Sequence, residues 1–216
     1  MIFCGRSLTM EFENQDLLVE GAKGFGIQLN EKQVEAFDLY LRELLKWNQK
    51  INLTAIRTEK GIVLKHFIDS LSAIPYLFGT TSLLDIGSGA GFPGIPLKIV
   101  QPSLEVTLID SVRKKVDFQK HIVRMLGLKG TETLHGRIQD KAIVQSMTGQ
   151  FDAVISRAFS DLRTFLRLSF PFLRKGGILL AMKGEFDEEE TSFHTKGEET
   201  RYRLQRTTSF LLPKSS

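Results

Sequence analysis

One short stretch, residues 83–94, holds the residues best suited to bind a small ligand. An apolar run there leads into Asp85, and glycines follow at alternate positions: Gly87, Gly89 and Gly91. Because glycine has no Cβ, the backbone at these positions can approach a ligand closely and adopt positive φ. Pro93 suits the first turn of a helix, where free N–H groups can bind a carboxylate or a phosphate. Together these residues are typical of a strand, turn and helix that hold a nucleotide cofactor.

The spacing of glycines and acidic residues distinguishes two kinds of cofactor. Gly89, Gly91 and Gly94 match the G-x-G-x-x-G pattern of dinucleotide-binding proteins. Asp110 follows about 20 residues later, where that fold places an acid for the ribose. A carboxylate at Asp85 would repel a pyrophosphate, whereas it suits S-adenosylmethionine, which has an ammonium group, a sulfonium charge and a ribose but no phosphate. The sequence therefore favours S-adenosylmethionine over NAD, with a helix cap as the structural alternative for both aspartates.

This motif and several other segments resemble a known family. Residues 85–97, with prolines at 93 and 96, are similar to the signature of the bacterial 16S rRNA (guanine-N7) methyltransferase G family, also called glucose-inhibited division protein B. The glycine turn alone marks only the methyltransferase superfamily, whereas the two prolines and the Trp-Asn and Ser-Arg-Ala segments specify the family. Over residues 30–185 the matching segments are Trp47-Asn48, Asn52-Leu53-Thr54, His66, Asp69-Ser70-Leu71, Leu108-Ile109-Asp110-Ser111, Lys114-Lys115, Ser156-Arg157-Ala158 and Met182-Lys183-Gly184.

The resemblance implies both an activity and a partner. The protein would be a class I, Rossmann-like methyltransferase that uses S-adenosyl-L-methionine to methylate N7 of a guanine in 16S rRNA, guanine 527 in rRNA numbering. Its partner would be 16S rRNA in the small ribosomal subunit or its precursor, and the protein would act as a monomer. Two other functions stay open: an NAD(P)-dependent Rossmann oxidoreductase and a noncatalytic RNA-binding ribosome-assembly factor.

The same resemblance assigns roles to residues that follow the predicted strands. Gly87 would let the backbone approach the methionine end, Phe92 would form an apolar wall or belong to the core, and Asp110 would accept from the ribose hydroxyls. Ile138 would pack on the adenine ring, with the side-chain amide of Gln139 beside it. The complete set predicted to bind the cofactor is Asp85, Gly87, Gly89, Gly91, Phe92, Asp110, Ile138, Gln139 and Arg157.

Two basic residues are candidates for positioning rather than for catalysis. Arg157 would hold the cofactor carboxylate, a protein carboxylate or an RNA phosphate, with a structural ion pair as the alternative. Lys183 would hold a backbone phosphate. No residue is assigned as catalytic, because guanine N7 has a lone pair and no proton and can attack the sulfonium methyl without a general base. Alignment of the two groups and exclusion of water would then provide the catalysis.

Six polar residues precede the glycine turn: Asn48, Asn52, Thr54, His66, Asp69 and Ser70. His66 and Asp69 are three residues apart, so on a helix they share a face. They would face RNA or close over the cofactor, or they would form a buried hydrogen bond between helices. The four histidines are scattered and the one cysteine, Cys4, lies outside every motif, so no metal site is predicted.

Two periodicities divide the chain. Residues 12–78 are predicted to be helical, including Glu31–Lys46 with Asn30 as its N-cap, and Ile62–Phe78. From residue 82, strands alternate with helices, which indicates a mostly parallel sheet covered on both faces. The predicted strands are Leu83–Ile86, Glu105–Asp110, Thr131–His135, Ala153–Ser156, Ile178–Lys183 and Arg203–Leu212, and the predicted helices between them are Ile95–Gln101, Val112–Leu126, Gln139–Met147 and Asp161–Leu173, the last capped by Gly176-Gly177. We therefore expect a helical N-terminal extension, residues 1–78, packed on a Rossmann-like α/β core, residues 79–216.

Length and composition are those of a soluble globular protein. The chain has 216 residues, 42% of them apolar and 25% charged, and no apolar run approaches the roughly 20 residues of a membrane helix. With one cysteine and no signal-peptide pattern, we expect a cytoplasmic protein. The net charge is only +4, but residues 81–150 carry 9 basic and 6 acidic side chains, several of them on one predicted helix: Arg113, Lys114, Lys115, Lys120 and Arg124. This helix either contacts phosphates or has an ordinary solvated face.

Overall fold

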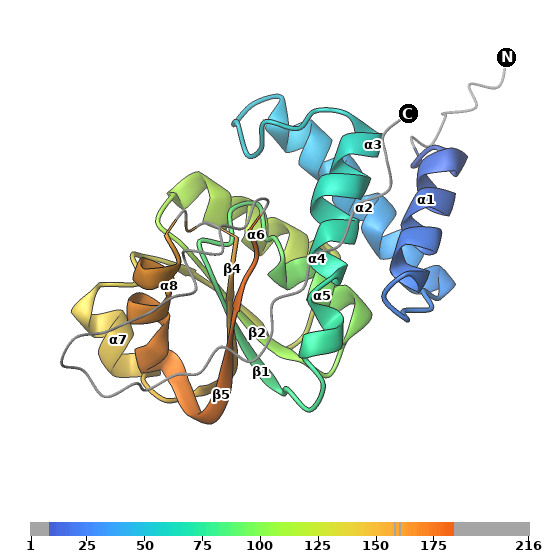
Figure 1. The fold of residues 1–216 in the computed structure, drawn as a ribbon. Helices are drawn as coiled ribbons and strands as arrows, with labels where there is room; N and C mark the ends of the chain where they lie inside the picture. Colours follow the sequence, from blue (N-terminus) through green and yellow to red (C-terminus); the bar gives the residue numbers. More distant parts are fainter. Residues whose placement is uncertain (1–8, 158, 160, 184–216) are drawn as a thin grey trace, which may run out of the picture.

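A parallel sheet of five strands forms the centre of the structure, a computed structural model that describes residues 9–157, 159 and 161–183 (Figure 1). The strand order is β3-β2-β1-β4-β5, and every neighbouring pair is parallel. The order reverses between β1 and β4, which is where sheets of this type leave a crevice at the carboxyl ends of the strands. The strands are β1 (Ser82–Ile86), β2 (Glu105–Asp110), β3 (Thr131–His135), β4 (Phe151–Ser156) and β5 (Leu173–Ala181). All five predicted strands that fall within the described residues are confirmed, and Arg203–Leu212 lies outside them.

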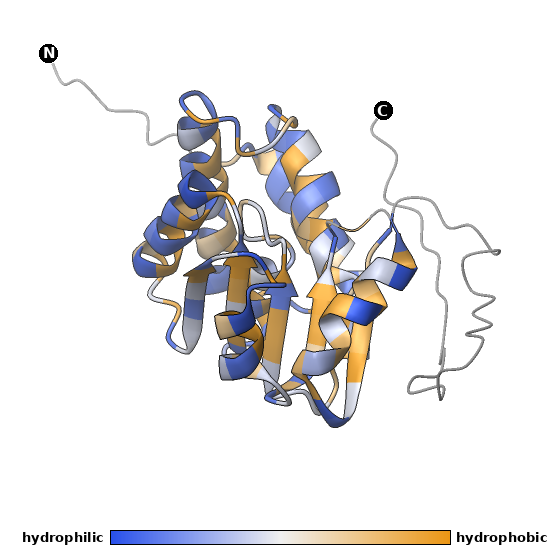
Figure 2. Cartoon of the chain, turned by 90° about the vertical axis from the view of Figure 1, so that its left-hand side faces the viewer, coloured by the Kyte–Doolittle hydropathy of each residue, from blue (hydrophilic) through white to orange (hydrophobic). Residues whose placement is uncertain are grey.

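Helices cover both faces of the sheet, as the alternating pattern predicts. On one face, Val106, Leu108 and Ile155 pack in a core with α5 (Gly94–Val100) and α6 (Arg113–Met125). On the other face, Leu84 and Val154 belong to a second apolar cluster beside α7 (Lys141–Met147) and α8 (Leu162–Ser169). Figure 2 shows hydrophobic strands at the centre and hydrophilic residues on the outward faces of the helices. Strands buried on both faces lack polar alternation, which explains the nearly continuous apolar runs in the sequence.

The first part of the chain is helical and packs on the sheet unit. Its main elements are α1 (Phe12–Lys23) and α2 (Glu31–Asn48). Asn30 caps α2, as predicted, and its side chain and that of Gln33 accept from each other's backbone N–H at 3.0 Å in a capping box. Phe37, Leu41 and Leu44 on the apolar stripe of α2 are fully buried and share one continuous core with the sheet.

The single helix predicted for Ile62–Phe78 is wrong in its continuity. The chain instead forms α3 (Glu59–Ile62), a π-helical segment η1 (Val63–Ile68), α4 (Asp69–Leu71) and a 3₁₀ turn η2 (Ile74–Tyr76). Pro75 lies in the 3₁₀ turn and has no backbone N–H to continue an α-helix. A π-helical turn widens the helix locally and is common beside functional sites.

The prediction that Gly176-Gly177 cap the last helix is also wrong. Helix α8 ends at Ser169, a 3₁₀ turn η3 (Phe170–Phe172) follows, and both glycines lie inside β5. The register between β4 and β5 shifts there, and Gly176 has a φ of 83°. A Cβ on Gly177 would lie 2.8 Å from the Asp152 carbonyl oxygen. The glycines therefore permit an irregularity in the strand rather than a helix cap.

Tyr40 joins the N-terminal helices to the loop after β1. Tyr40 belongs to α2 and its ring is fully buried. The centroid of this ring lies 5.2 Å from that of Phe92 and 5.4 Å from that of Phe67. Its hydroxyl donates to the carbonyl oxygen of Ala90 at 2.6 Å. A buried carbonyl that loses its donor costs more than the net value of the bond, so this contact fixes where α2 sits against the loop.

We expect Tyr40→Phe to lower the free energy of unfolding by about 1–3 kcal/mol, because the ring packing stays while the Ala90 carbonyl loses its donor. Urea denaturation measures this change. Tyr76→Phe is the matched control, since the Tyr76 hydroxyl has no hydrogen bond to the part of the chain that the structure describes. Equal losses in the two variants would contradict the role given to the Tyr40 hydroxyl.

Candidate cofactor-binding site

A cavity of about 360 Å³ opens at the carboxyl ends of β1, β2 and β3. This edge is where parallel sheets with crossover helices bind their ligands. Four of the residues predicted to bind the cofactor line the cavity, namely Gly87, Asp110, Ile138 and Gln139. The remaining lining residues are Ile86, Ile109, Ser111, Gly136, Arg137 and Phe159. The sheet thus brings together residues from Ile86 to Phe159, and the apolar side chains of Ile138 and Phe159 form part of the cavity wall.

The glycine turn after β1 closes on itself through backbone hydrogen bonds. Gly87 and Ser88 both donate to the Ile109 carbonyl, at 2.8 and 3.2 Å, and Gly91 donates to the Ser88 carbonyl at 2.7 Å. The φ angles of Gly87, Gly89 and Gly91 are 69°, 59° and 101°, a region that strains other residues. A Cβ on Gly91 would also lie 2.4 Å from Ile95 Cδ1. The glycine pattern is therefore explained by this turn itself.

Asp110 connects the glycine turn to the start of α6 and also lines the cavity. Its Oδ2 accepts from the Gly89 N–H at 2.8 Å, and its Oδ1 accepts from the Val112 N–H at 2.8 Å. Val112 is the N-cap residue that precedes α6, so Asp110 holds the approach to the helix and does not cap an N–H group of the helix itself, as its structural alternative had it. A carboxylate has about four acceptor positions, so each Asp110 oxygen can still accept a hydroxyl hydrogen from the cavity. The two roles are compatible.

Gln119 is a structural residue of the site that sequence reasoning missed. Its fully buried amide nitrogen donates to Ser88 Oγ at 2.9 Å and to the Gly89 carbonyl at 2.7 Å. The signal that could have found it is a polar residue on the apolar face of α6, three positions from both Val116 and Ile122. A buried amide in that place requires partners, and here they are the atoms of the glycine turn.

Asp85 lies beneath the turn and does not line the cavity. Its Oδ2 accepts from the Gly94 N–H at 2.8 Å, so it caps the first residue of α5. Its Oδ1 is buried without a hydrogen-bond partner among the described residues. Burial raises the pKa of Asp85 to about 7, against the opposing effects of the Gly94 hydrogen bond and the Arg157 charge. The carboxyl is therefore poised to be charged or neutral near physiological pH.

Arg157 joins the end of β4 to the π-helical segment. Its NH1 atom lies 3.1 Å from Asp69 Oδ2, and its NH2 atom donates to the Lys65 carbonyl at 3.2 Å and lies 3.3 Å from His66 Nδ1. The guanidinium carbon is 6.0 Å from the centroid of the Phe92 ring. The structural ion pair considered as the alternative for Arg157 is present. Arg157, which follows β4, is thereby joined to His66 and Asp69 in the helical first part of the chain.

The hydrogen bonds of His66 define its tautomer. A guanidinium can only donate, so His66 Nδ1 accepts from Arg157 and the ring proton lies on Nε2, 2.7 Å from Thr54 Oγ1. Burial and the Arg157 charge lower the pKa of His66 to about 4, so the ring is neutral at pH 7. Asn48 holds the preceding loop, because its Oδ1 accepts from the N–H groups of Leu53 and Thr54 at 2.7 and 3.0 Å.

Phe92 and the remaining predicted residues have other surroundings. The Phe92 ring is buried between His66, at a centroid distance of 4.5 Å, and Tyr40, so it has the core position considered for it. Ser70 is buried and donates to the His66 carbonyl at 2.5 Å. Asn52 is exposed, and Lys183 is half-buried just after β5, outside the lining of the cavity.

The described residues contain neither a metal-binding cluster nor a membrane-spanning helix. No group of three or more His, Cys, Asp or Glu side chains gathers there in a way that could hold a metal ion. Within the same residues, each helix is too short or too polar to cross a bilayer.

The raised pKa of Asp85 gives the protein a specific pH dependence. The folded state keeps the Asp85 proton up to about pH 7, whereas the unfolded chain loses it near pH 3.9. The folded state therefore binds more protons between these values, and the Asp85 contribution to the free energy of unfolding falls as pH rises from about 4 to 7. We expect Asp85→Asn to remove this decline, measured by urea denaturation between pH 5 and 8.

The difference between the two pH curves isolates Asp85. His66 acts in the opposite direction over about pH 4 to 6.5, but it is common to both proteins. Asp16→Asn, on the exposed side of α1, is the matched control. Parallel curves for wild type and Asp85→Asn would show that Asp85 is ionised throughout and would contradict the expectation.

The sequence and the fold are similar to those of known methyltransferases. The family model described as rRNA small subunit methyltransferase G matches residues 33–214. The ribosomal RNA small subunit methyltransferase G of Geobacter metallireducens is 49% identical over 181 residues, which cover 84% of this chain and 81% of that protein. The protein of the same name from Acetivibrio thermocellus is 43% identical over 180 residues, covering 83% and 74%.

A solved structure confirms the predicted fold class. The structure described as a putative caffeoyl-CoA O-methyltransferase from Staphylococcus aureus has a TM-score of 0.50 over 78% of this chain and 72% of its own. It is 13% identical in sequence, so it supports the Rossmann-like methyltransferase fold alone. The match of the family model and the identity to curated relatives go further, and they confirm the resemblance first seen in the glycine turn. The chain belongs to the rRNA small subunit methyltransferase G family.

Proposed function

We propose that this protein transfers the methyl group of S-adenosylmethionine to N7 of a guanine in 16S rRNA, guanine 527 in rRNA numbering. Membership of the rRNA small subunit methyltransferase G family supports methylation of small-subunit rRNA as the reaction. The choice of cofactor is supported by the hydrogen bonds of the glycine turn. The choice of N7 is supported by the sequence resemblance and by the chemistry of the residues at the site.

The choice of cofactor rests on the acceptors to which the backbone N–H groups of the turn donate. A dinucleotide pyrophosphate needs free N–H groups at the start of the helix after β1. Here these N–H groups donate within the chain. Gly87 and Ser88 donate to the Ile109 carbonyl, and Gly91 and Phe92 donate to the Ser88 carbonyl. Gly89 donates to Asp110 and Gly94 donates to Asp85. One of these acceptors, Asp110, lines the cavity, and its carboxylate would repel a phosphate there. The turn suits a cofactor without phosphates, and this disfavours NAD.

We propose an order in which the cavity would hold the parts of S-adenosylmethionine. Asp110 would accept from the ribose hydroxyls with its remaining acceptor positions. Ile138 and Phe159 would pack against the adenine, beside Gln139. Gly87, which has no Cβ, would admit the methionine end at the close of β1. When bound, the cofactor supplies a methyl group on a sulfonium, an electrophile that needs no metal.

The residues of this chain would contribute positioning rather than proton transfer. Guanine N7 carries a lone pair and no proton, so its attack requires no base. Ser88 Oγ accepts from Gln119 and donates to the Ile109 carbonyl, and His66 is engaged by Thr54 and Arg157. These two side chains are thus committed to structural contacts. Rate enhancement would come from alignment and from the exclusion of water around the target base, which must leave its stack to be reached.

The reaction is tested with small ribosomal subunits from a bacterial strain that lacks this methyltransferase. The purified protein and S-adenosylmethionine are added, and nuclease fragments of the 16S rRNA are mapped by mass spectrometry. We expect one added methyl group, at N7 of guanine 527. Methylation at another base would contradict the assigned position. Binding of the subunit without any methyl transfer would favour a noncatalytic assembly factor, and tight binding of NAD alone would favour an oxidoreductase.

Arg157 can be tested as a positioning residue in the same assay. Arg157→Ala should lower the methylation rate at least tenfold, because it releases the contacts to Asp69, Lys65 and His66 beside the end of β4. Arg157→Lys keeps the charge but not the planar fork, so it should restore folding and only part of the rate. Melting temperatures of both variants are measured alongside. A loss of rate that merely follows a collapse in melting temperature would show that the ion pair is structural only.

Asp110 can be tested through cofactor affinity. Asp110→Ala should weaken the binding of S-adenosylhomocysteine by about 1–3 kcal/mol, because the ribose hydroxyls and the Gly89 N–H lose their acceptor. Isothermal titration calorimetry measures the change. Glu132→Ala, an exposed carboxylate on β3 outside the cavity, is the matched control. Unaltered affinity in Asp110→Ala would leave Asp110 with only its structural contacts to Gly89 and Val112.

A further inference from the structure

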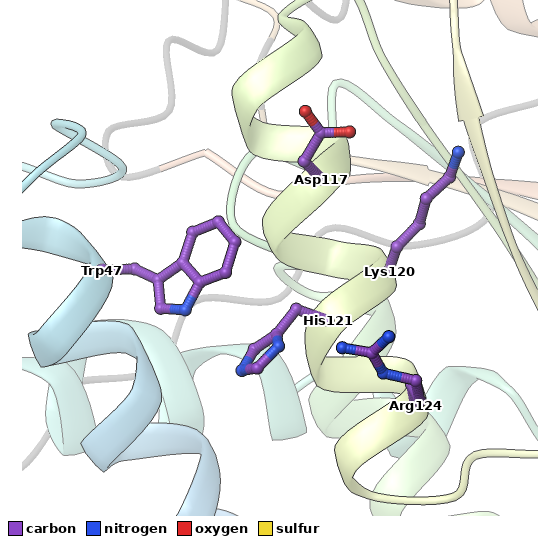
Figure 3. Close-up of a pocket in the computed structure, with 5 residues that line it drawn as sticks. All are labelled: Trp47, Asp117, Lys120, His121 and Arg124. Carbon is purple, nitrogen blue, oxygen red and sulfur yellow. The ribbon is translucent and has the colours of Figure 1, made fainter.

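A second cavity lies on the surface between α2 and α6, away from the cofactor cavity (Figure 3). It has a volume of about 230 Å³ and is lined by Trp47, Asp117, Lys120, His121 and Arg124. A water molecule takes up about 30 Å³ in the liquid, so the cavity has room for a much larger group. Its lining combines an indole with cationic side chains, and none of these residues has a role in the site described above.

The rings at the base of this cavity are fixed by contacts from both helices. Trp47 packs edge-on against Phe118, with ring centroids 5.4 Å apart, and lies 5.0 Å from His121. His121 Nε2 lies 2.6 Å from Glu43 Oε2. Figure 3 shows the indole and the imidazole in the space between the helices, with Lys120 and Arg124 along α6. A rigid, half-buried indole loses little entropy when a flat ligand stacks on it.

The acidic groups around the cavity are already paired, whereas two of its cations are not. Glu43 contacts His121 and Lys46, and although burial raises its pKa, these hydrogen bonds lower it overall. Asp117 lies 3.6 Å from Arg113. Lys120 and Arg124 are exposed and have no acidic partner in the part of the chain that the structure describes. The cavity therefore offers an uncompensated positive charge on one side of an aromatic ring.

We propose that this cavity binds one nucleotide of a single-stranded rRNA segment, with its base stacked on Trp47 and its phosphates held by Lys120 and Arg124. An aromatic ring beside cations is the arrangement with which proteins hold unpaired nucleotides of any sequence. The proposal rests on the proposed function, because it makes this segment part of the rRNA that presents the target guanine. Lys120 lies about 10 Å along α6 from the helix start beside Asp110, so one RNA strand can reach both sites.

The single tryptophan of the chain allows a direct test. Fluorescence of the full chain reports only Trp47, and polyuridylate should quench it because a base stacks on the indole. The double variant Lys120→Glu/Arg124→Glu should bind polyuridylate at least tenfold more weakly. The slope of log binding constant against log salt concentration should become less steep by about 1 to 2. The same variant should bind S-adenosylhomocysteine as wild type does, which shows that the cofactor cavity is intact.

Matched controls separate charge from stacking. Lys32→Glu/Lys129→Glu changes the net charge equally at exposed positions outside the cavity and should leave the affinity for polyuridylate within twofold of wild type. Trp47→Phe keeps an aromatic ring against Phe118, whereas Trp47→Leu removes stacking. Both variants lack the only tryptophan, so their affinity is measured by the fluorescence anisotropy of a fluorescein-labelled oligouridylate, and it should fall more in the leucine variant at similar melting temperatures. Quenching of equal strength by polyphosphate or by polyglutamate would overturn the proposal, because neither carries a base.

The outcome is independent of whether the proposed reaction is correct. If wild type methylates small subunits and the Lys120/Arg124 variant keeps its affinity for polyuridylate, the cavity does not bind RNA and the reaction stands. If wild type shows base-dependent quenching but transfers no methyl group, the RNA cavity stands and the reaction does not. A tenfold rise in the KM for small subunits in the variant, with the control pair unchanged, is the expected result.

Discussion

The rest of the structure depends on how the turn after β1 is held. Three side chains from different elements bind this turn: Asp110 from β2 through the Gly89 N–H, Gln119 from α6 through the Gly89 carbonyl, and Tyr40 from α2 through the Ala90 carbonyl. Each contact is buried or partly buried, where losing a partner costs more than the bond contributes. The glycines let the turn adopt its positive φ angles, and these side chains select one conformation from those that glycine permits.

The same contacts account for the chemistry of the site. A turn in which most N–H groups already donate to carbonyl and carboxyl oxygens is poorly suited to bind a phosphate, although its glycine spacing matches the dinucleotide pattern. Spacing of glycines therefore identifies the turn, and the neighbouring carboxylates decide what can bind beside it. Asp85 contributes from beneath, where burial raises its pKa to about 7 and one oxygen stays without a partner among the described residues.

Sequence reasoning predicted the sheet, and four of the nine residues that it assigned to the cofactor line the cavity, because both have local signals. Apolar runs, turn residues and the Asn30 cap each act within a few residues, so the strands and α2 could be found. Gly87, Asp110, Ile138 and Gln139 line the cavity because the carboxyl ends of parallel strands must meet. Gln119 escaped notice because its role depends on a distant turn. The π-helical segment Val63–Ile68 also escaped notice, because the apolar spacing there fits an ordinary α-helix.

Arg157 shows how the N-terminal helices take part in the site without lining the cofactor cavity. Its guanidinium pairs with the half-buried Asp69 and acts electrostatically on the buried Asp85 as well. Burial raises the pKa of Asp69, and the Arg157 charge opposes this effect. The arginine therefore favours the ionised form of the Asp69 carboxyl. His66, which contacts Arg157, is also hydrogen-bonded to Thr54, and Asn48 holds the loop that carries Thr54. In the reaction proposed above, which needs alignment rather than proton transfer, these contacts would hold the residues near the end of β4 in one arrangement, because each contact removes one way in which they could shift.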